Sequence, residues 1–149
     1  MSNEWYWEGN VVKDVSAYLQ KEGWTIKRTA DTETQEAGVD IQAQKSGEVL
    51  LVEVKGYPSK VYQRGEHKGQ PKPTNPSTQA RHWYSEVLFS AILRQAEHPT
   101  ATVAIALPRF ATFTTLIRRT RHALSKLGIV VYVIEESGAV ESIAPTDER

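Results

Sequence analysis

The chain has 149 residues, 40% of them hydrophobic and 24% charged, and a formal net charge of zero, all ordinary values for one globular domain. It contains no cysteine, which excludes a disulfide framework, a thiol nucleophile and a cysteine zinc site. No apolar run approaches the roughly 20 residues that cross a bilayer, and the acidic, aromatic N-terminus lacks the layout of a signal peptide, so we expect a cytoplasmic protein without membrane association.

The first part of the chain predicts one helix and three strands. Apolar residues recur at helical spacing between residues 8 and 21, and Gly23 ends that helix. Short alternating or apolar runs then predict strands at residues 24–27, 39–43 and 49–55. A turn at residues 45–48 joins the last two strands as a hairpin.

The second part predicts helices that alternate with strands. It begins with a stretch at residues 56–77 that contains four prolines and has the length of a functional or disordered loop. The elements expected after it are a helix at residues 79–95, a strand at 101–107, a helix at 110–127 and a strand at 129–134. From about residue 136 the chain is acidic and is expected to be a loose tail.

The predicted order is therefore helix, three strands, helix, strand, helix, strand. Three consecutive strands followed by alternating helices imply an α/β protein with a mixed five-stranded sheet flanked by helices. Neither an internal repeat nor an inter-domain linker is visible, so residues 1–149 are expected to form a single domain.

Three charged residues stand on the predicted hairpin, where charge is costly unless it is paired or binds an ion. Glu53 and Lys55 point the same way because strand side chains alternate between faces. The hairpin can bring Asp40, near the start of the neighbouring strand, beside Glu53. Two adjacent carboxylates repel each other, and a divalent cation relieves the repulsion. The alternative is a surface ion pair at a strand end for Glu53 and Lys55, and a turn-ending carboxylate for Asp40.

These residues resemble the motif of the PD-(D/E)xK nuclease superfamily, which has the restriction-endonuclease-like fold. The motif is an acid at the head of a hairpin and then Glu-x-Lys on the next strand, here Asp40 and Glu53-Val54-Lys55. The pattern looks most like archaeal Holliday junction resolvases and Mrr-type restriction domains. No proline precedes Asp40, unlike in the superfamily's name. The resemblance implies that Asp40 and Glu53 hold Mg²⁺ or Mn²⁺ and that Lys55 positions the attacking water.

Two further residues match auxiliary positions of the same superfamily. Glu8, at the start of the first helix, lies on its apolar, sheet-facing stripe and could be a third metal ligand; the alternative is an acid that favours the positive end of the helix dipole. Gln79, at the start of the next helix, could lie near the nucleophilic water or a phosphate, or could cap the helix. Glu36 competes with Asp40 as the hairpin acid, but it sits in the polar turn and ranks below it.

Charge is unevenly distributed along the chain. Residues 1–40 carry four Lys/Arg and eight Asp/Glu, residues 41–134 carry thirteen and five, and residues 135–149 carry one and five, for net charges of −4, +8 and −4. The basic middle suggests a face that meets a polyanion. Its candidate nucleic-acid-binding residues are Lys60, Arg64, Lys68 and Lys72 in the long loop and Arg118, Arg119 and Arg121 on the last helix. The helix cluster could equally be a solvated face.

The sequence therefore predicts a nuclease that hydrolyses phosphodiester bonds with Mg²⁺ or Mn²⁺. DNA is favoured over RNA only through the families that the chain resembles. The alternative is a catalytically inactive module of the same fold that binds nucleic acid or a protein partner. The N-terminal aromatic residues Trp5, Tyr6 and Trp7 could stack on bases or belong to the core. The sequence leaves a homodimer open.

Overall fold

The computed structural model describes residues 4–30, 38–62, 65–73 and 75–145. Its elements, in chain order, are α1 (Glu8–Lys21), β1 (Thr25–Thr29), β2 (Ile41–Lys45), β3 (Glu48–Val54), α2 (Pro76–Glu97), β4 (Thr102–Pro108), α3 (Ala111–Leu127), β5 (Val130–Ile134) and β6 (Val140–Ile143). The predicted α/β class is confirmed. The sheet has six strands instead of the predicted five.

The strands form one mixed sheet in the order of the chain, β1-β2-β3-β4-β5-β6. The first three strands are antiparallel neighbours, β3, β4 and β5 run parallel, and β6 returns antiparallel to β5. The parallel strands are joined by α2 and α3, as expected for crossovers that need a helix. In the β2–β3 register, Ile41 is opposite Val52, which places Asp40 across from the end of β3.

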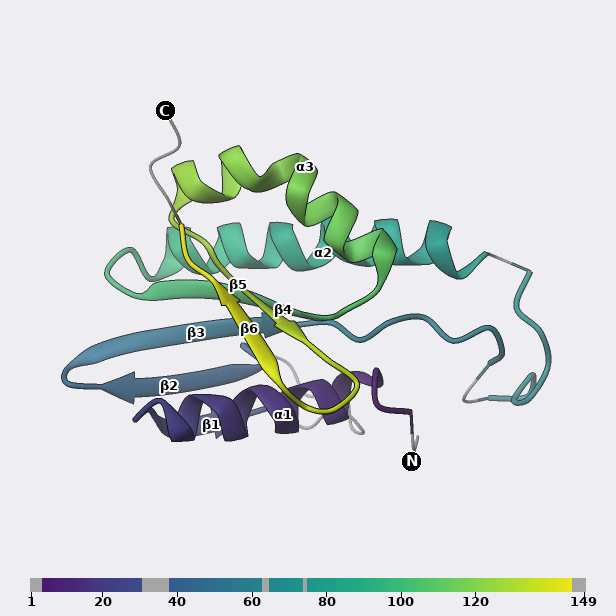
Figure 1. The fold of residues 1–149 in the computed structure, drawn as a ribbon, viewed down its shortest axis with the longest axis horizontal. Helices are drawn as coiled ribbons and strands as arrows, with labels where there is room; N and C mark the ends of the chain where they lie inside the picture. Colours follow the sequence, from purple (N-terminus) through teal and green to yellow (C-terminus); the bar gives the residue numbers. More distant parts are fainter. Residues whose placement is uncertain (1–3, 31–37, 63–64, 74, 146–149) are drawn as a thin grey trace.

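Helices cover both faces of the sheet: α1 lies on one face, and α2 and α3 lie on the other (Figure 1). Each face has its own core, so alternate residues of β3 enter different cores. Leu50, Val52 and Val54 pack with the residues of α1, and Leu51 packs with those of α2 and α3. By this alternation Glu53 and Lys55 face α2.

Two helix ends follow from local chemistry. α2 begins at Pro76, three residues before the predicted start, because Asn75 caps it by accepting a hydrogen bond from the Ser77 backbone N–H at 2.8 Å. Asn before Pro is a favourable helix start. α3 ends at Gly128, whose φ of 73° is the left-handed conformation that glycine adopts most easily.

The prediction of a loose tail from about residue 136 is wrong for residues 140–143. These residues form β6, which pairs with β5 over four positions, including Val131 with Ile143. The side chains of β6 are intermediate or exposed, so the strand is held mainly by backbone pairing at the sheet edge.

The stretch between β3 and α2 is irregular, as predicted, but its described part folds back on itself. Val61 and Pro71 form an isolated antiparallel bridge. Around it, the Tyr62 N–H donates to the Gln70 carbonyl at 3.0 Å, and the Lys72 N–H donates to the Lys60 carbonyl at 3.0 Å. Among the described residues, no helix is long and apolar enough to span a membrane.

Candidate active site

Asp40 and Glu53 meet at the C-terminal end of β3, on the side of the sheet that α2 covers. Asp40 Oδ2 accepts a hydrogen bond of 2.7 Å from the Val54 backbone N–H, which holds its carboxylate against the end of the strand. The carboxyl groups of Asp40 and Glu53 also share a hydrogen bond. The structure thus brings together the two acids that the sequence paired through the hairpin.

Glu53 is buried, with 5% of its surface exposed, and its partner from α2 is Arg94. The Arg94 Nε lies 2.6 Å from Glu53 Oε1, and its Nη1 lies 3.2 Å from Glu97 Oε1. A buried carboxylate requires such compensation because removing a charge from water is costly. Arg94 therefore supplies positive charge beside Glu53.

Lys55 points to the same side of the sheet as Glu53, as predicted. Its ammonium lies 3.1 Å from Glu86 Oε2 and 5.8 Å from the centre of the Trp83 ring. It is also close enough to Asp40 and Glu8 to lower the pKa of both carboxyl groups. Lys55 thus lies among three acids: Glu8 from α1, Asp40 just before β2, and Glu86 from α2.

Glu8 approaches this group from the opposite side of the sheet end because α1 begins directly against Gly56. A Cβ added to Gly56 would lie 2.5 Å from the Tyr6 carbonyl and 2.7 Å from the Glu8 backbone N. The Tyr57 N–H donates to that same Tyr6 carbonyl at 3.0 Å. Glycine at this position is therefore a steric requirement for seating the start of α1 next to Lys55.

The acids of the site resist ionisation. Burial, and then the charge of Asp40, raises the pKa of Glu8 to about 7, against the lowering effect of Lys55. Burial also raises the pKa of Glu53 to about 7, although Arg94 opposes the shift. The pKa of Asp40 is raised by burial as well, with the Val54 N–H acting in the opposite direction. Carboxyl groups with pKa values displaced towards neutrality cluster at functional sites.

Asp40 and Glu53 fit a magnesium ion by donor type, since Mg²⁺ usually binds one or two carboxylates and fills its other positions with water and phosphate oxygens. Their mutual repulsion when both are ionised is the charge that such an ion would neutralise. Among the described residues, however, no three His, Asp or Glu side chains converge into a group that could hold a metal. Glu8 couples to Asp40 electrostatically but does not complete a three-acid set, and its role as a ligand stays a prediction.

Gln79 lies on the side of α2 that faces the site, one turn before Trp83. Its side-chain oxygen is 3.5 Å from the Lys72 Nζ, so it contacts the long loop. No described contact joins it to the acids, and its predicted role near the attacking water stays a prediction.

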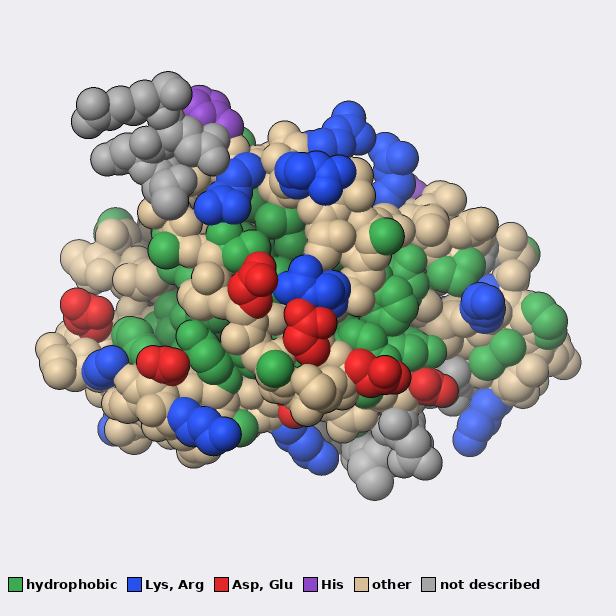
Figure 2. Space-filling view, viewed as in Figure 1, with side chains coloured by type: hydrophobic (Ala, Val, Ile, Leu, Met, Phe, Trp, Pro, Cys, Tyr) green, Lys and Arg blue, Asp and Glu red, His purple; other side chains and the backbone are tan. Residues whose placement is uncertain are grey.

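The predicted basic residues fall into two groups. Lys60, Lys68 and Lys72 belong to the loop that leaves the site, whereas Arg118, Arg119 and Arg121 line a groove of about 440 Å³ between α3 and the β5–β6 edge. Figure 2 shows Lys and Arg side chains gathered over α3. Arg64 and Glu36 lie outside the described residues.

Four site residues were not identified from the sequence: Gly56, Trp83, Glu86 and Arg94. The last three stand on one side of α2 at helical spacing from Gln79. Counting 4, 7 and 15 residues forward from Gln79 would have found them, since such offsets lie on one helix face. Gly56 has no comparable signal, because its role depends on a contact with α1.

Comparisons with known proteins support the fold. No family model and no curated protein matches the sequence. The structure is similar to the crystal structure of an XisH family protein from Nostoc punctiforme, with a TM-score of 0.52 and 16% identity over 89% of this chain and 98% of that one. It is equally similar to an fdxN element excision controlling factor protein from Anabaena variabilis, with a TM-score of 0.52 and 16% identity over 93% of this chain and 98% of that one.

Structural similarity at 16% sequence identity supports conclusions about the fold alone. Together with the mixed sheet order and the helices on both faces, this similarity confirms the predicted restriction-endonuclease-like α/β fold.

Proposed function

We propose that this protein is a metal-dependent nuclease that hydrolyses phosphodiester bonds of DNA. The observation that carries the proposal is the hydrogen-bonded pair of carboxyl groups, the buried Glu53 and the half-buried Asp40, with the Lys55 ammonium beside them. Two raised pKa values and a lysine at one sheet end are costly for stability and are explained by a catalytic role. Excision control, named for one structural neighbour, is a process to which DNA cleavage or binding could belong.

In this proposal each residue of the centre has one task. Asp40 and Glu53 would hold Mg²⁺ or Mn²⁺, and the ion would supply Lewis-acid activation of water and neutralisation of phosphate charge. Lys55 orients the nucleophile. Glu8, with a pKa near neutrality, is placed to take up or return a proton close to Asp40. Arg94 compensates the charge of Glu53, a role that a divalent cation held by the two acids would share.

Binding of the DNA backbone is assigned to the two basic surfaces. The loop residues Lys60, Lys68 and Lys72 follow the end of β3 where the acids meet, and Gln79 contacts Lys72 from α2. Arg64, which lies outside the described residues, is assigned to the same surface from the sequence alone. Arg118, Arg119 and Arg121 form the second surface, and no ion pair joins them to an acid among the described residues. Phosphate contacts of this kind bind DNA independently of sequence.

The test is cleavage of supercoiled, linear and branched DNA with Mg²⁺, Mn²⁺ or EDTA. We expect metal-dependent cleavage by the unsubstituted protein and loss of at least a hundredfold in rate for Glu53→Gln, because this change removes a metal ligand. Glu97→Gln is the matched control, since Glu97 also pairs with Arg94 but is exposed. Cleavage that persists in Glu53→Gln would refute the assigned role.

One observation favours a second candidate, a non-catalytic DNA-binding module. The guanidinium of Arg94 already compensates the charge of Glu53 at 2.6 Å, so the pair does not need a metal to be tolerated. DNA binding without cleavage under every metal condition, together with no measurable binding of Mn²⁺ by calorimetry, would establish this candidate instead.

A further inference from the structure

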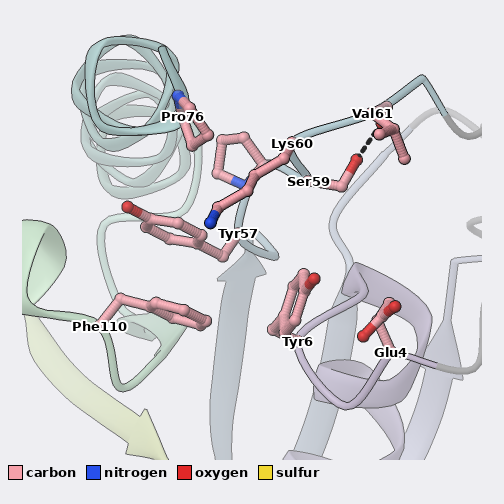
Figure 3. A pocket seen from close by; sticks show the side chains of 9 residues that line it. Glu4, Tyr6, Tyr57, Ser59, Lys60, Val61, Pro76 and Phe110 are labelled. Atoms are coloured by element: carbon pink, nitrogen blue, oxygen red, sulfur yellow. Dashed lines mark hydrogen bonds between the residues drawn. The ribbon is translucent and has the colours of Figure 1, made fainter. Parts of the chain in front are cut away.

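A small pocket lies beside the acid site, and three aromatic rings form part of its wall. Its volume is about 260 Å³, and its lining includes Tyr6, Tyr57, Phe110, Lys60, Ser59 and Glu4. In Figure 3 the Tyr57 and Phe110 rings lie one over the other, Tyr6 stands beside them, and Lys60 extends along Tyr57. Pockets for drug-sized ligands begin at about 300 Å³, so this one suits a single planar ring system.

The rings are organised as a stack with one ring set at right angles to it. Tyr57 is parallel to Phe110, with centroids 3.8 Å apart and an interplanar angle of 7°. Trp5 is parallel to the same Phe110, at 5.4 Å and 5°. Tyr6 meets Phe110 edge-on, at 87°. Tyr6 and Tyr57 are only half-buried, so an incoming flat ring can reach them from solvent.

The pocket and the acid site are close to each other along the chain at two places. Tyr6 is two residues before Glu8, and Tyr57 is two residues after Lys55. The hydrogen bond from the Tyr57 N–H to the Tyr6 carbonyl connects these two segments. Two extended residues span at most about 7 Å, and a strand of B-DNA advances 3.4 Å per nucleotide. A DNA strand with a phosphate at the acids would therefore pass the mouth of the pocket within about two nucleotides.

The lining has the chemistry of a nucleobase site. Aromatic faces stack on any base. The Tyr6 hydroxyl is paired with Glu4, whereas the Ser59 hydroxyl, which donates to the Val61 carbonyl, keeps lone pairs that can accept a hydrogen bond from the base edge. Lys60 offers one cation for the adjoining phosphate. A paired base inside a duplex cannot enter such a pocket, since its faces are covered by its neighbours.

We propose that this pocket, walled by Tyr6, Tyr57 and Phe110, binds one unpaired or extruded nucleobase of a DNA strand whose phosphate lies at the acid site. The inference rests on the proposed function, and it specifies the substrate as DNA with an unpaired base next to the contacted phosphate. Fully paired duplex binds through the basic surfaces alone.

The experiment measures equilibrium binding in EDTA, where metal-dependent cleavage does not occur. The probes are a short duplex with one unpaired adenine and the same duplex with an abasic residue in its place. We expect the unsubstituted protein to prefer the adenine duplex about tenfold, within the range of a single base–aromatic stack. Tyr6→Leu should bind both duplexes equally. Tyr62→Leu is the matched control, because Tyr62 stands in the neighbouring loop but does not line the pocket, and it should keep the preference.

A second measurement needs no substitution. With 2-aminopurine as the unpaired base, stacking in the pocket should quench its fluorescence when the unsubstituted protein binds. Equal affinity for the two duplexes, unchanged or brighter 2-aminopurine emission, loss of the preference in Tyr62→Leu, or no DNA binding would each overturn the proposal. Cleavage without the tenfold preference would refute this inference alone, and the preference without any metal-dependent cleavage would refute the nuclease alone.

Discussion

The buried Glu53 side chain has two partners that act on its pKa in opposite directions. The Asp40 carboxyl group disfavours its ionisation, whereas the Arg94 guanidinium favours it, and burial decides the balance by raising the pKa of Glu53 to about 7. At neutral pH the site therefore sits near the point where a proton and a cation compete for the same carboxylate. Small changes at Arg94 should shift that competition.

Arg94→Gln tests this balance. At pH 8 the substitution leaves the Glu53 carboxylate, whose side chain is 7% exposed, without its counter-charge, and we expect the free energy of unfolding to fall by about 2 kcal/mol. The same variant should bind Mn²⁺ more tightly, because the ion no longer competes with a guanidinium. Urea denaturation and calorimetry measure the two effects. In a Glu53→Gln background the Arg94 substitution should cost little, and a full cost there would contradict the pairing.

Glu8 predicts a pH dependence of stability. Its folded pKa, about 7, is above the ordinary value of 4.5, so the folded state holds this proton more tightly than the unfolded state. Stability from Glu8 is then complete below pH 4.5 and is lost as the pH rises through 7, by up to about 3 kcal/mol. Glu8→Gln should match the parent at pH 4.5 and exceed it at pH 8 in metal-free urea denaturation. Glu22→Gln, at the exposed end of α1, is the control.

At the scale of elements, the site depends on how α1 is seated against the end of β3. The Tyr6 carbonyl receives the Tyr57 N–H, and Gly56 leaves room for the backbone of Glu8. The start of one helix and the end of the central strand are thereby held at a fixed separation. Both the acid group and the aromatic pocket use this junction.

Gly56→Ala should disrupt the junction. The added Cβ would meet backbone atoms at 2.5 and 2.7 Å, which cannot rotate away, so we expect a loss of about 3 kcal/mol, at the upper end of overpacking costs. Gly69→Ala is the control: its φ of 84° strains an alanine, but no atom lies within 4 Å of the new Cβ, and it should cost about 1–2 kcal/mol. Equal melting temperatures of the two variants would show that the contact is not tight.

The same elements explain what sequence reasoning could reach. Strand alternation was sufficient to place Glu53 and Lys55 on one face, and the hairpin was sufficient to bring in Asp40, because both are local rules. These two rules do not reach the Arg94 contact, which joins residues 41 positions apart; helical spacing from Gln79 was the signal that could have found it. β6 was missed because its polar, half-exposed residues carry no apolar pattern, and its stability comes from pairing with β5. The dipeptide Asn75-Pro76 could have predicted the start of α2, because Asn before Pro is a favourable helix start.

At the scale of the whole molecule, positive charge is divided between two surfaces. The long loop continues from the β3 end where the acids meet, whereas the arginine groove lies at the β5–β6 edge, three strands from β3 in the sheet. Neighbouring strands are about 4.8 Å apart, so the two surfaces are separated by roughly 14 Å across the sheet. A duplex advances 3.4 Å per base pair and can reach both.

Salt dependence distinguishes one contact surface from two. Each lost phosphate contact lowers the slope of log K against log salt by about 0.9, so two matched triple variants can be compared on one long duplex. The first is Lys60→Gln, Lys68→Gln and Lys72→Gln, and the second is Arg118→Gln, Arg119→Gln and Arg121→Gln.

We expect each triple variant to flatten the slope by two to three units, and the effects to add, because separate sites are independent. An unchanged slope in the loop variant would separate the acid site from the bound DNA and would count against the nuclease. An unchanged slope in the arginine variant would make the groove a solvated face and leave the loop as the whole interface. Additive losses would mean that one duplex contacts both surfaces and crosses from the acid site over α3. The arginine groove would then determine the length of DNA that is bound beyond the phosphate at the acid site.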